Sequence, residues 1–196
     1  MKLFFLPGAC SLAPHIAMLE LGIKPALEKV NPKDKSNLLE YNPKGYVPTL
    51  ITDDDQVLTE ASVILQYLAD QKPKAGLMPS VGTWERYQCM EWLNFVATEL
   101  HKGFSPLFKD YSDEIKTIFR QNLDKRIGHL DQHLATHKYL MGETVTVADI
   151  YAYVVLNWTK FVKWDISHHK NVMGFLDAMG NRPAVQEAIQ TEKRTH

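Results

Sequence analysis

The order of strand-like and helix-like segments in the first 72 residues most constrains the fold of this chain. Strands are expected at residues 2–6, 26–30, 47–51 and 56–58, and helices at 11–21, at 35–41 and from 61 onward. Strands joined by a crossover helix pair in parallel, whereas closely spaced strands form a hairpin. The order β-α-β-α-β-β-α therefore predicts a compact α/β domain of thioredoxin-like type over residues 1–72.

The remainder of the chain has a helical pattern throughout. Residues 73–82 are rich in proline and glycine and predict a linker. Beyond it, apolar residues recur at helical spacing, as in the stripe of Leu93, Val96 and Leu100. Residues 83–196 are accordingly expected to form an all-α helical bundle.

Composition and charge argue against nucleic-acid-binding, membrane and secreted disulfide-rich proteins. Hydrophobic residues make up 45% of the 196 residues, and the net charge is −1 without a long basic block, so nucleic acid is not an expected partner. No apolar run approaches the roughly 20 residues that span a bilayer, so no membrane partner is expected. The N-terminus lacks the pattern of a signal peptide, and two cysteines do not make a disulfide framework. These features predict a cytoplasmic protein.

Cys10 lies where the first strand passes into the first helix. Backbone N–H groups at a helix start are unpaired and carry partial positive charge, which stabilises a thiolate. The cysteine is therefore a candidate for thiol chemistry, although a small buried hydrophobe is an equally open interpretation. A dithiol redox motif would need a second cysteine at position 13, which is Ala13. Redox work at Cys10 would thus take its second thiol from a small molecule, for which glutathione is the obvious candidate.

Pro48 interrupts the third predicted strand. Proline forfeits a ladder hydrogen bond and is excluded from central strands, so the sequence favours a cis Val47–Pro48 bond over an edge-strand proline. In a thioredoxin-like domain this loop lies beside the active thiol. The Val47 backbone is then expected to pair with a peptide-like ligand as an added strand does.

The helix after the fourth strand starts at Thr59-Glu60-Ala61-Ser62. Its free N–H groups can hold a ligand carboxylate, and Glu60 can pair with a ligand ammonium. Simple capping by Thr59, with an acid in the first turn, explains the same pattern. The two interpretations are compatible.

Three features of the helical region are expected to be structural. Thr146 and Asp149 predict a capping box. His129, His133 and His137 share one helix face, but no acidic or cysteine ligand completes a site, so a solvated face is favoured and no metal is expected. His101 alone would be a surface or packing residue.

Taken together, these motifs resemble those of cytosolic glutathione S-transferases, and specifically the bacterial beta class. The resemblance rests on Pro-Gly-Ala-Cys-Ser-Leu-Ala-Pro-His at residues 7–15, Asn-Pro-Lys-Gly-Tyr-Val-Pro at 42–48, Leu-Thr-Glu at 58–60, Glu-Trp-Leu-Asn-Phe at 91–95, His-Lys-Gly at 101–103 and Thr-Val-Ala-Asp at 146–149. Classes that use a first-strand tyrosine are disfavoured by Phe4 and Phe5, and beta-like classes carry a cysteine where Cys10 stands. One departure is Ala61, where many transferases have serine.

The resemblance implies a homodimeric enzyme that conjugates reduced glutathione to hydrophobic electrophiles, with thiol–disulfide exchange at Cys10. Glutathione would be a co-substrate, and no cofactor is implied. The catalytic residues would be Cys10, Ser11 and His101. The residues expected to bind glutathione are Ala9, Cys10, Lys35, Val47, Pro48, Glu60, Ala61, Thr98, Glu99, His101 and Lys102. The electrophile pocket is expected at Phe104, Leu107, Phe108 and Trp158.

Within this set, Val47 would contact the cysteinyl backbone, and Glu60 with the Ala61 N–H would hold the γ-glutamyl end. Lys35 and Lys102 would hold the glycyl carboxylate. Two alternatives remain open. One is a glutathione-dependent thiol reductase or peroxidase in which Cys10 chemistry dominates. The other is a non-catalytic binding scaffold, a role that the same fold serves elsewhere.

Overall fold

The computed structural model describes residues 1–194. It divides into two compact units, one formed by residues 1–76 with 181–194 and the other by residues 77–180. Each unit is described below by itself.

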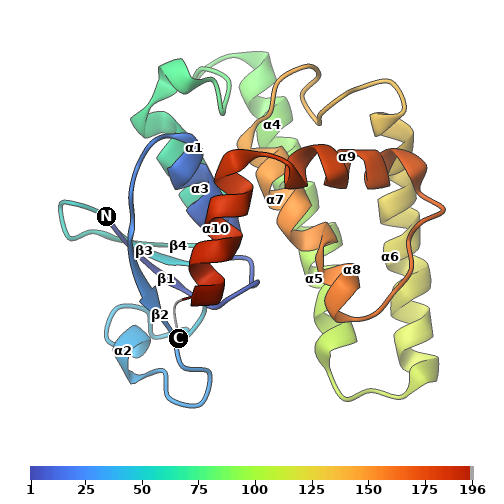
Figure 1. Cartoon of the computed structure of the whole chain (residues 1–196), viewed down its shortest axis with the longest axis horizontal. Helices are drawn as coiled ribbons and strands as arrows, with labels where there is room; N and C mark the ends of the chain where they lie inside the picture. The colour runs from blue at the N-terminus through green and yellow to red at the C-terminus, as the bar shows by residue number, and fades with distance from the viewer. Residues whose placement is uncertain (195–196) are drawn as a thin grey trace. The chain divides into compact units, whose positions relative to one another are not determined.

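The first unit is built on a four-stranded mixed sheet (Figure 1). Its strands are β1 (Lys2–Phe5), β2 (Ala26–Lys29), β3 (Thr49–Ile51) and β4 (Val57–Thr59). They lie in the order β2-β1-β3-β4, with β1 and β2 parallel and the other two pairs antiparallel. This confirms the predicted crossover followed by a hairpin, and the unit is thioredoxin-like.

Both faces of this sheet are covered by helices. The helices of the unit are α1 (Leu12–Glu20), α2 (Ser36–Leu39), α3 (Ala61–Gln71) and α10 (Pro183–Arg194), with a 3₁₀ turn at Pro73–Ala75. Figure 1 shows α1 and α3 packed together on one side of the sheet and α2 on the other. On the α2 side, Phe4, Val30, Leu38 and Ile51 form a buried cluster. Because successive strand side chains alternate, Leu3 and Phe5 are buried toward the opposite face.

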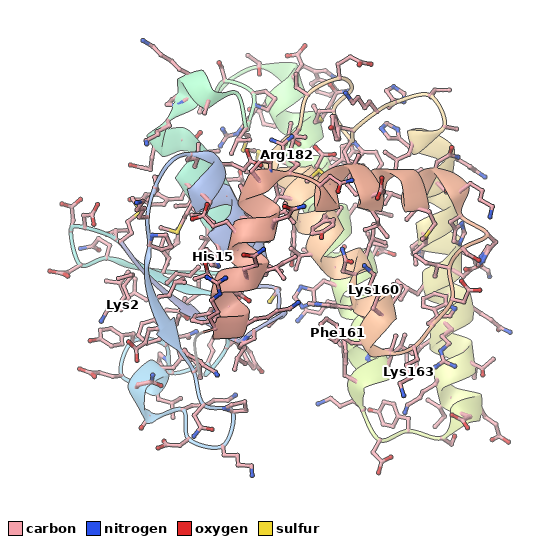
Figure 2. The ribbon with its side chains drawn as sticks, viewed as in Figure 1. Lys2, His15, Lys160, Phe161, Lys163 and Arg182 are labelled. Carbon is pink, nitrogen blue, oxygen red and sulfur yellow. The ribbon has the colours of Figure 1, made fainter. Side chains whose placement is uncertain are left out.

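The helix α10 belongs to the first unit, although the expected helical domain runs from residue 83 to the last residue. The helical pattern predicts that the C-terminal helix belongs to the bundle of residues 83–196, whereas α10 packs against α1 in the first unit. Its apolar face carries Val185 and Ala188, and its buried Glu192 lies 3.1 Å from Nδ1 of His15 on α1. Figure 2 shows His15 on the side of α1 that faces α10. Helical periodicity predicts the helix but not the surface on which it docks.

The second unit is helical, as expected. Its elements are α4 (Trp84–Phe95), a π-helix at Val96–His101, α5 (Lys102–Phe104), a 3₁₀ turn at Ser105–Phe108, α6 (Asp113–Leu134), α7 (Val147–Leu156), α8 (Trp158–Phe161) and α9 (Lys170–Gly180). All ten residues of α7 are buried, so this helix forms the centre of the core.

The predicted capping box at the start of α7 is confirmed. Asp149 accepts hydrogen bonds from the backbone N–H and the hydroxyl of Thr146, both at 2.8 Å. It also accepts one from the Leu140 N–H at 2.7 Å. In the described part of the chain, no helix combines the length and apolar character that a membrane crossing requires.

Candidate functional site

Cys10 lies in the turn that joins β1 to α1, next to Ser11 at the N-cap of the helix. Its thiol is buried and donates a hydrogen bond to the Val47 carbonyl oxygen at 3.3 Å. The Ser11 hydroxyl is fully buried, accepts from the Leu6 N–H at 3.1 Å and donates to the Leu6 oxygen at 3.2 Å. Ser11 therefore ties the turn to the end of β1, so its hydroxyl is already engaged by the backbone.

The loop before β3 contains the predicted cis peptide bond between Val47 and Pro48. Within residues 1–194, the Val47 N–H donates no hydrogen bond. Asn42 supports the loop: its buried amide donates to the Tyr46 oxygen and to the Thr49 hydroxyl, both at 2.9 Å. Sequence reasoning assigned Asn42 no role, because nothing in its spacing shows which backbone groups it reaches.

The backbone N–H groups at the start of α3 are available to bind a ligand. Glu60 is the N-cap and adopts a φ of 71°, in the left-handed region that residues with side chains seldom occupy. Val63 and Ile64 both donate to the Glu60 oxygen. The N–H groups of Ala61 and Ser62 find no acceptor in the described part of the chain. Strain of this kind clusters at functional sites, and two unpaired N–H groups at a helix start favour an anion.

The Glu60 carboxylate already has a partner that sequence reasoning missed. Lys44 donates to the Glu60 carboxylate at 3.0 Å and to the Thr59 hydroxyl at 2.9 Å. Both charged side chains are well exposed, so this ion pair contributes little stability. A ligand ammonium could share or replace Lys44 at low cost.

The register of the sheet brings these three segments to one end of the strands. Phe4 pairs with Thr49, and Thr49 pairs with Thr59, both in antiparallel fashion. The chain that leaves β1, the chain that enters β3 and the chain that leaves β4 therefore emerge at the same end of the sheet. This end holds the Cys10 turn, Val47–Pro48 and the start of α3.

The other residues predicted in this unit have structural partners. The Lys35 ammonium donates to the Gly45 oxygen at 2.9 Å. The Ala9 N–H donates to the Leu6 oxygen at 3.0 Å, and Pro48 is buried.

The remaining predicted residues belong to the second unit, where some form an aromatic cluster. The His101 Nδ1 lies 2.6 Å from the hydroxyl of Tyr151, and its ring stands edge-on to Trp158 with centroids 4.8 Å apart. Phe104 and Phe108 contact the same indole, at 5.9 and 5.6 Å. Phe104, Leu107 and Trp158 are buried, whereas Phe108 is 52% exposed. Three of the four residues predicted to line a pocket are thus mainly core residues.

Thr98, Glu99 and Lys102 lie together along a groove of about 420 Å³ in the second unit. The groove is also lined by Gly103, Phe119, Asn122, Leu123 and Arg126. Arg126 on α6 forms an ion pair with Glu99 at 2.6 Å. A Cβ at Gly103 would lie 2.9 Å from Leu123, so glycine permits the close approach of α5 to α6.

Thr98, Glu99 and His101 belong to a π-helix, and Lys102 directly follows it. This π-helix replaces the regular helix expected here. His101 contacts residues of α7 and α8, whereas Thr98, Glu99 and Lys102 border the groove beside α6. Short π-helical turns occur frequently at functional sites. Apolar spacing alone does not reveal such a turn, because it differs from an α-helix by one residue in register.

Comparison with known proteins agrees with the motif-based resemblance. A family model for the N-terminal domain of glutathione S-transferases matches residues 8–71, and one for the C-terminal domain matches residues 95–183. Glutathione S-transferase GstA of Escherichia coli O157:H7 is 40% identical over 198 residues, covering 98% of both chains. The chain belongs to the glutathione S-transferase family.

Solved glutathione S-transferases share the fold closely. The enzyme of a sphingomonad, in complex with glutathione, is 39% identical with a TM-score of 0.95 over 100% of both chains. The bacterial beta class enzyme of Sphingomonas chungbukensis is 41% identical with a TM-score of 0.93 over 98% of both chains. The resemblance to bacterial beta class glutathione S-transferases is confirmed.

The second cysteine of this glutathione S-transferase differs from Cys10. Cys89 is fully buried within α4, and burial raises the pKa of its thiol to about 11, with the Asp149 charge acting in the same direction. A buried thiol that stays protonated is a poor nucleophile. Cys89 is therefore a packing residue.

His129 and His133 lie on α6, whereas His137 lies beyond the end of that helix, so the three histidines do not share one helix face as expected. His133 and His137 also have structural partners. Nε2 of His133 lies 3.0 Å from the Leu140 oxygen, and Nδ1 of His137 lies 3.1 Å from the His133 oxygen. The rings of His133 and His137 stack at 4.2 Å. Their nitrogens are thus engaged with backbone oxygens rather than converging on one point.

Proposed function

We propose that this transferase conjugates the thiol of reduced glutathione to hydrophobic electrophiles, and that Cys10 also carries out thiol–disulfide exchange with glutathione. The observation that carries the proposal is that three groups lie at the same end of the sheet in the first unit. They are Cys10, the unpaired Val47 N–H and the unpaired N–H groups at the start of α3. The sphingomonad relative, solved with glutathione bound, has the same fold at 39% identity.

Each part of the tripeptide has a complementary group in this unit. The Val47 N–H offers a backbone donor to the cysteinyl residue, in the manner of an added strand. The Ala61 and Ser62 N–H groups suit the γ-glutamyl carboxylate, and the Glu60 carboxylate suits its ammonium. Lys35, half-buried near Gly45, supplies a cation for the glycyl carboxylate. His101 and Lys102 stay predictions from the resemblance.

The start of α1 supplies the electrostatics of thiol activation. Its first N–H groups carry partial positive charge, which favours a thiolate beside them. The glutathione thiolate then attacks the electrophilic carbon, forms the carbon–sulfur bond and expels the leaving group. In exchange, the Cys10 thiolate attacks the disulfide of oxidised glutathione, which forms a mixed disulfide and releases one glutathione thiolate.

The electrophile is expected against the aromatic cluster of the second unit. Phe108 offers the exposed face, and Trp158 lies directly behind it at 5.6 Å between centroids. Phe104 and Leu107 support these rings from the core. Such an apolar surface accepts hydrophobic molecules of varied shape.

We also propose a cytoplasmic homodimer. The helix α4 exposes Trp84, Tyr87 and Met90, which are 72%, 57% and 39% accessible. Neighbouring exposed apolar side chains on one helix are typical of an interaction surface. Sedimentation at twice the chain mass of 22.4 kDa is the expected result, and a monomer would contradict this part.

The proposal is tested by steady-state conjugation of glutathione to chlorodinitrobenzene. Glu60→Ala is expected to raise the KM for glutathione about tenfold, because it removes the partner of the ligand ammonium. Asp54→Ala, at the tip of the exposed β3–β4 hairpin, is the matched control and should leave KM unchanged. Absence of both turnover and glutathione binding in the unmodified protein would leave the scaffold alternative.

A further inference from the structure

A histidine–carboxylate cluster lies in the second unit on residues that the transferase chemistry does not use. Asp124 is on α6, and His168 and His169 end the loop between α8 and α9. Nε2 of His168 lies 3.1 Å from the Asp124 Oδ1, and Nε2 of His169 lies 2.9 Å from the same oxygen. The ligand-type atoms of all three residues lie within 4.8 Å of one another.

The start of α9, directly after the two histidines, is also held on α6. Asp131 lies seven residues after Asp124 and therefore on the same face of α6. Its carboxylate accepts the backbone N–H groups of Asn171 and Val172, at 2.8 and 2.9 Å. Within the loop, the Asp165 carboxylate accepts the Ser167 N–H at 2.8 Å and stabilises the turn that precedes the histidines. The histidine positions are therefore fixed by the polypeptide itself.

Helix α6 leaves room for the imidazoles beside Asp124. Gly128 lies one turn further along the helix, and a Cβ there would meet the His169 ring at 3.5 Å. The His169 ring therefore lies directly over the glycine. His169 is buried, with an exposed fraction of 8%. His168 is more open, with a side chain 58% exposed, so the cluster is accessible to an ion from solvent.

We propose that Asp124, His168 and His169 form a binding site for a divalent transition-metal ion of the zinc type. Two imidazoles and one carboxylate are a ligand set that Zn²⁺ and similar ions favour. Such ligands bind at about 2.0–2.2 Å, which places two ligands of one ion roughly 3.0–3.5 Å apart. The 3.1 Å between the His168 Nε2 and the Asp124 Oδ1 lies within this range, and the 2.9 Å between the His169 Nε2 and the same oxygen lies just below it. All ligand-type atoms of the three residues lie within 4.8 Å of one another, so a bound ion would draw them slightly together. The remaining coordination positions are open to water.

The convergence of ring nitrogens separates this cluster from His133 and His137. His133 and His137 direct ring nitrogens to backbone oxygens, whereas both Nε2 atoms here are directed at one carboxylate oxygen. A metal would tie the α8–α9 loop to α6 in addition to the Asp131 contacts. Bound Zn²⁺ is therefore expected to raise the thermal unfolding midpoint of the protein.

The test is calorimetric titration of the untagged, glutathione-free protein with ZnCl₂. The unmodified chain should bind one ion. Outer-shell partners alone are worth about 10- to 100-fold in metal affinity, so loss of a direct ligand in Asp124→Asn or His168→Gln should weaken binding at least about tenfold. His168 is exposed, so His168→Gln should fold normally, which circular dichroism checks.

Two control variants keep the result specific. His137→Gln changes an exposed histidine three residues beyond the end of α6, and Cys10→Ala removes the thiol most able to capture zinc. Both should bind zinc as the unmodified protein does, and Co²⁺ should give visible ligand-field bands that Asp124→Asn removes. The proposal is overturned by the absence of zinc uptake, or by uptake that survives both cluster variants, or by uptake lost with Cys10 or His137.

Discussion

The thiol of Cys10 donates a hydrogen bond to the carbonyl oxygen of Val47 across 3.3 Å. This contact joins the start of α1 to the loop that precedes β3, two segments 37 residues apart in the chain. It places the sulfur beside the backbone that is expected to bind the cysteinyl part of glutathione. The position of Cys10 thus links thiol chemistry to peptide recognition within one unit of the fold.

Replacement of Cys10 separates the two proposed activities. Cys10→Ala should keep conjugation within about tenfold of the unmodified enzyme, because the attacking thiol belongs to glutathione. It should abolish the mixed disulfide that mass spectrometry detects after exposure to oxidised glutathione. If conjugation also disappears in a folded Cys10→Ala protein, the proposed conjugation mechanism is wrong and the thiol reductase or peroxidase alternative is favoured.

A backbone substitution tests the anion site at the start of α3. Ala61→Pro removes one N–H, and proline is tolerated at the first helical position. The KM for glutathione should rise about tenfold, since one charge-assisted hydrogen bond is lost. Ala61→Gly keeps the N–H and is the control. Equal kinetics in both variants would exclude the Ala61 N–H as a ligand group.

The buried contact between His15 and Glu192 is expected to stabilise the first unit and its Cys10 turn. Both side chains are almost fully buried, and Glu192 also accepts the Gly8 N–H at 3.1 Å. Glu192→Gln leaves one acceptor oxygen for the two contacts with the Gly8 N–H and the His15 ring, removes the buried charge, and should lower the free energy of unfolding by about 1–3 kcal/mol. Urea unfolding measures the loss, and Glu187→Gln on the exposed face of α10 is the control. An unfolding curve unchanged by Glu192→Gln would show that α10 does not depend on this pair.

Cys89 gives stability a pH dependence of known sign. Burial raises its pKa from 9.0 to about 11, so above pH 9 the unfolded chain releases a proton that the folded chain retains. This contribution is fully present below pH 9 and is lost as pH rises toward 11, by about 2–3 kcal/mol. In Cys89→Ala, the free energy of unfolding should fall less steeply over this range. Identical slopes would show that the thiol does not titrate on unfolding.

Local patterns predicted much of the architecture and part of the site. The parallel crossover and the hairpin followed from segment spacing, the cis bond from proline inside a strand, and the capping box from Thr146 and Asp149. Each of these depends on residues close in sequence. The Cys10 turn was located for the same reason, because it lies between adjacent elements.

Features that depend on tertiary packing could not be predicted in this way. The docking of α10 rests on His15 and Glu192, which are 177 residues apart. The pairing of Lys44 with Glu60 arises because the sheet register brings their loops together. The cluster of Asp124 with His168 and His169 spans 44 and 45 residues and matches no spacing motif.

The central claim is that the first unit binds glutathione through the sheet edge that carries Cys10, Val47 and the start of α3. Calorimetric titration of the reduced protein with glutathione tests it most directly. The account predicts saturable binding of one glutathione per chain, with affinity lowered about tenfold in Glu60→Ala and unchanged in Asp54→Ala. No detectable binding, or equal binding by Glu60→Ala and the unmodified protein, would contradict it.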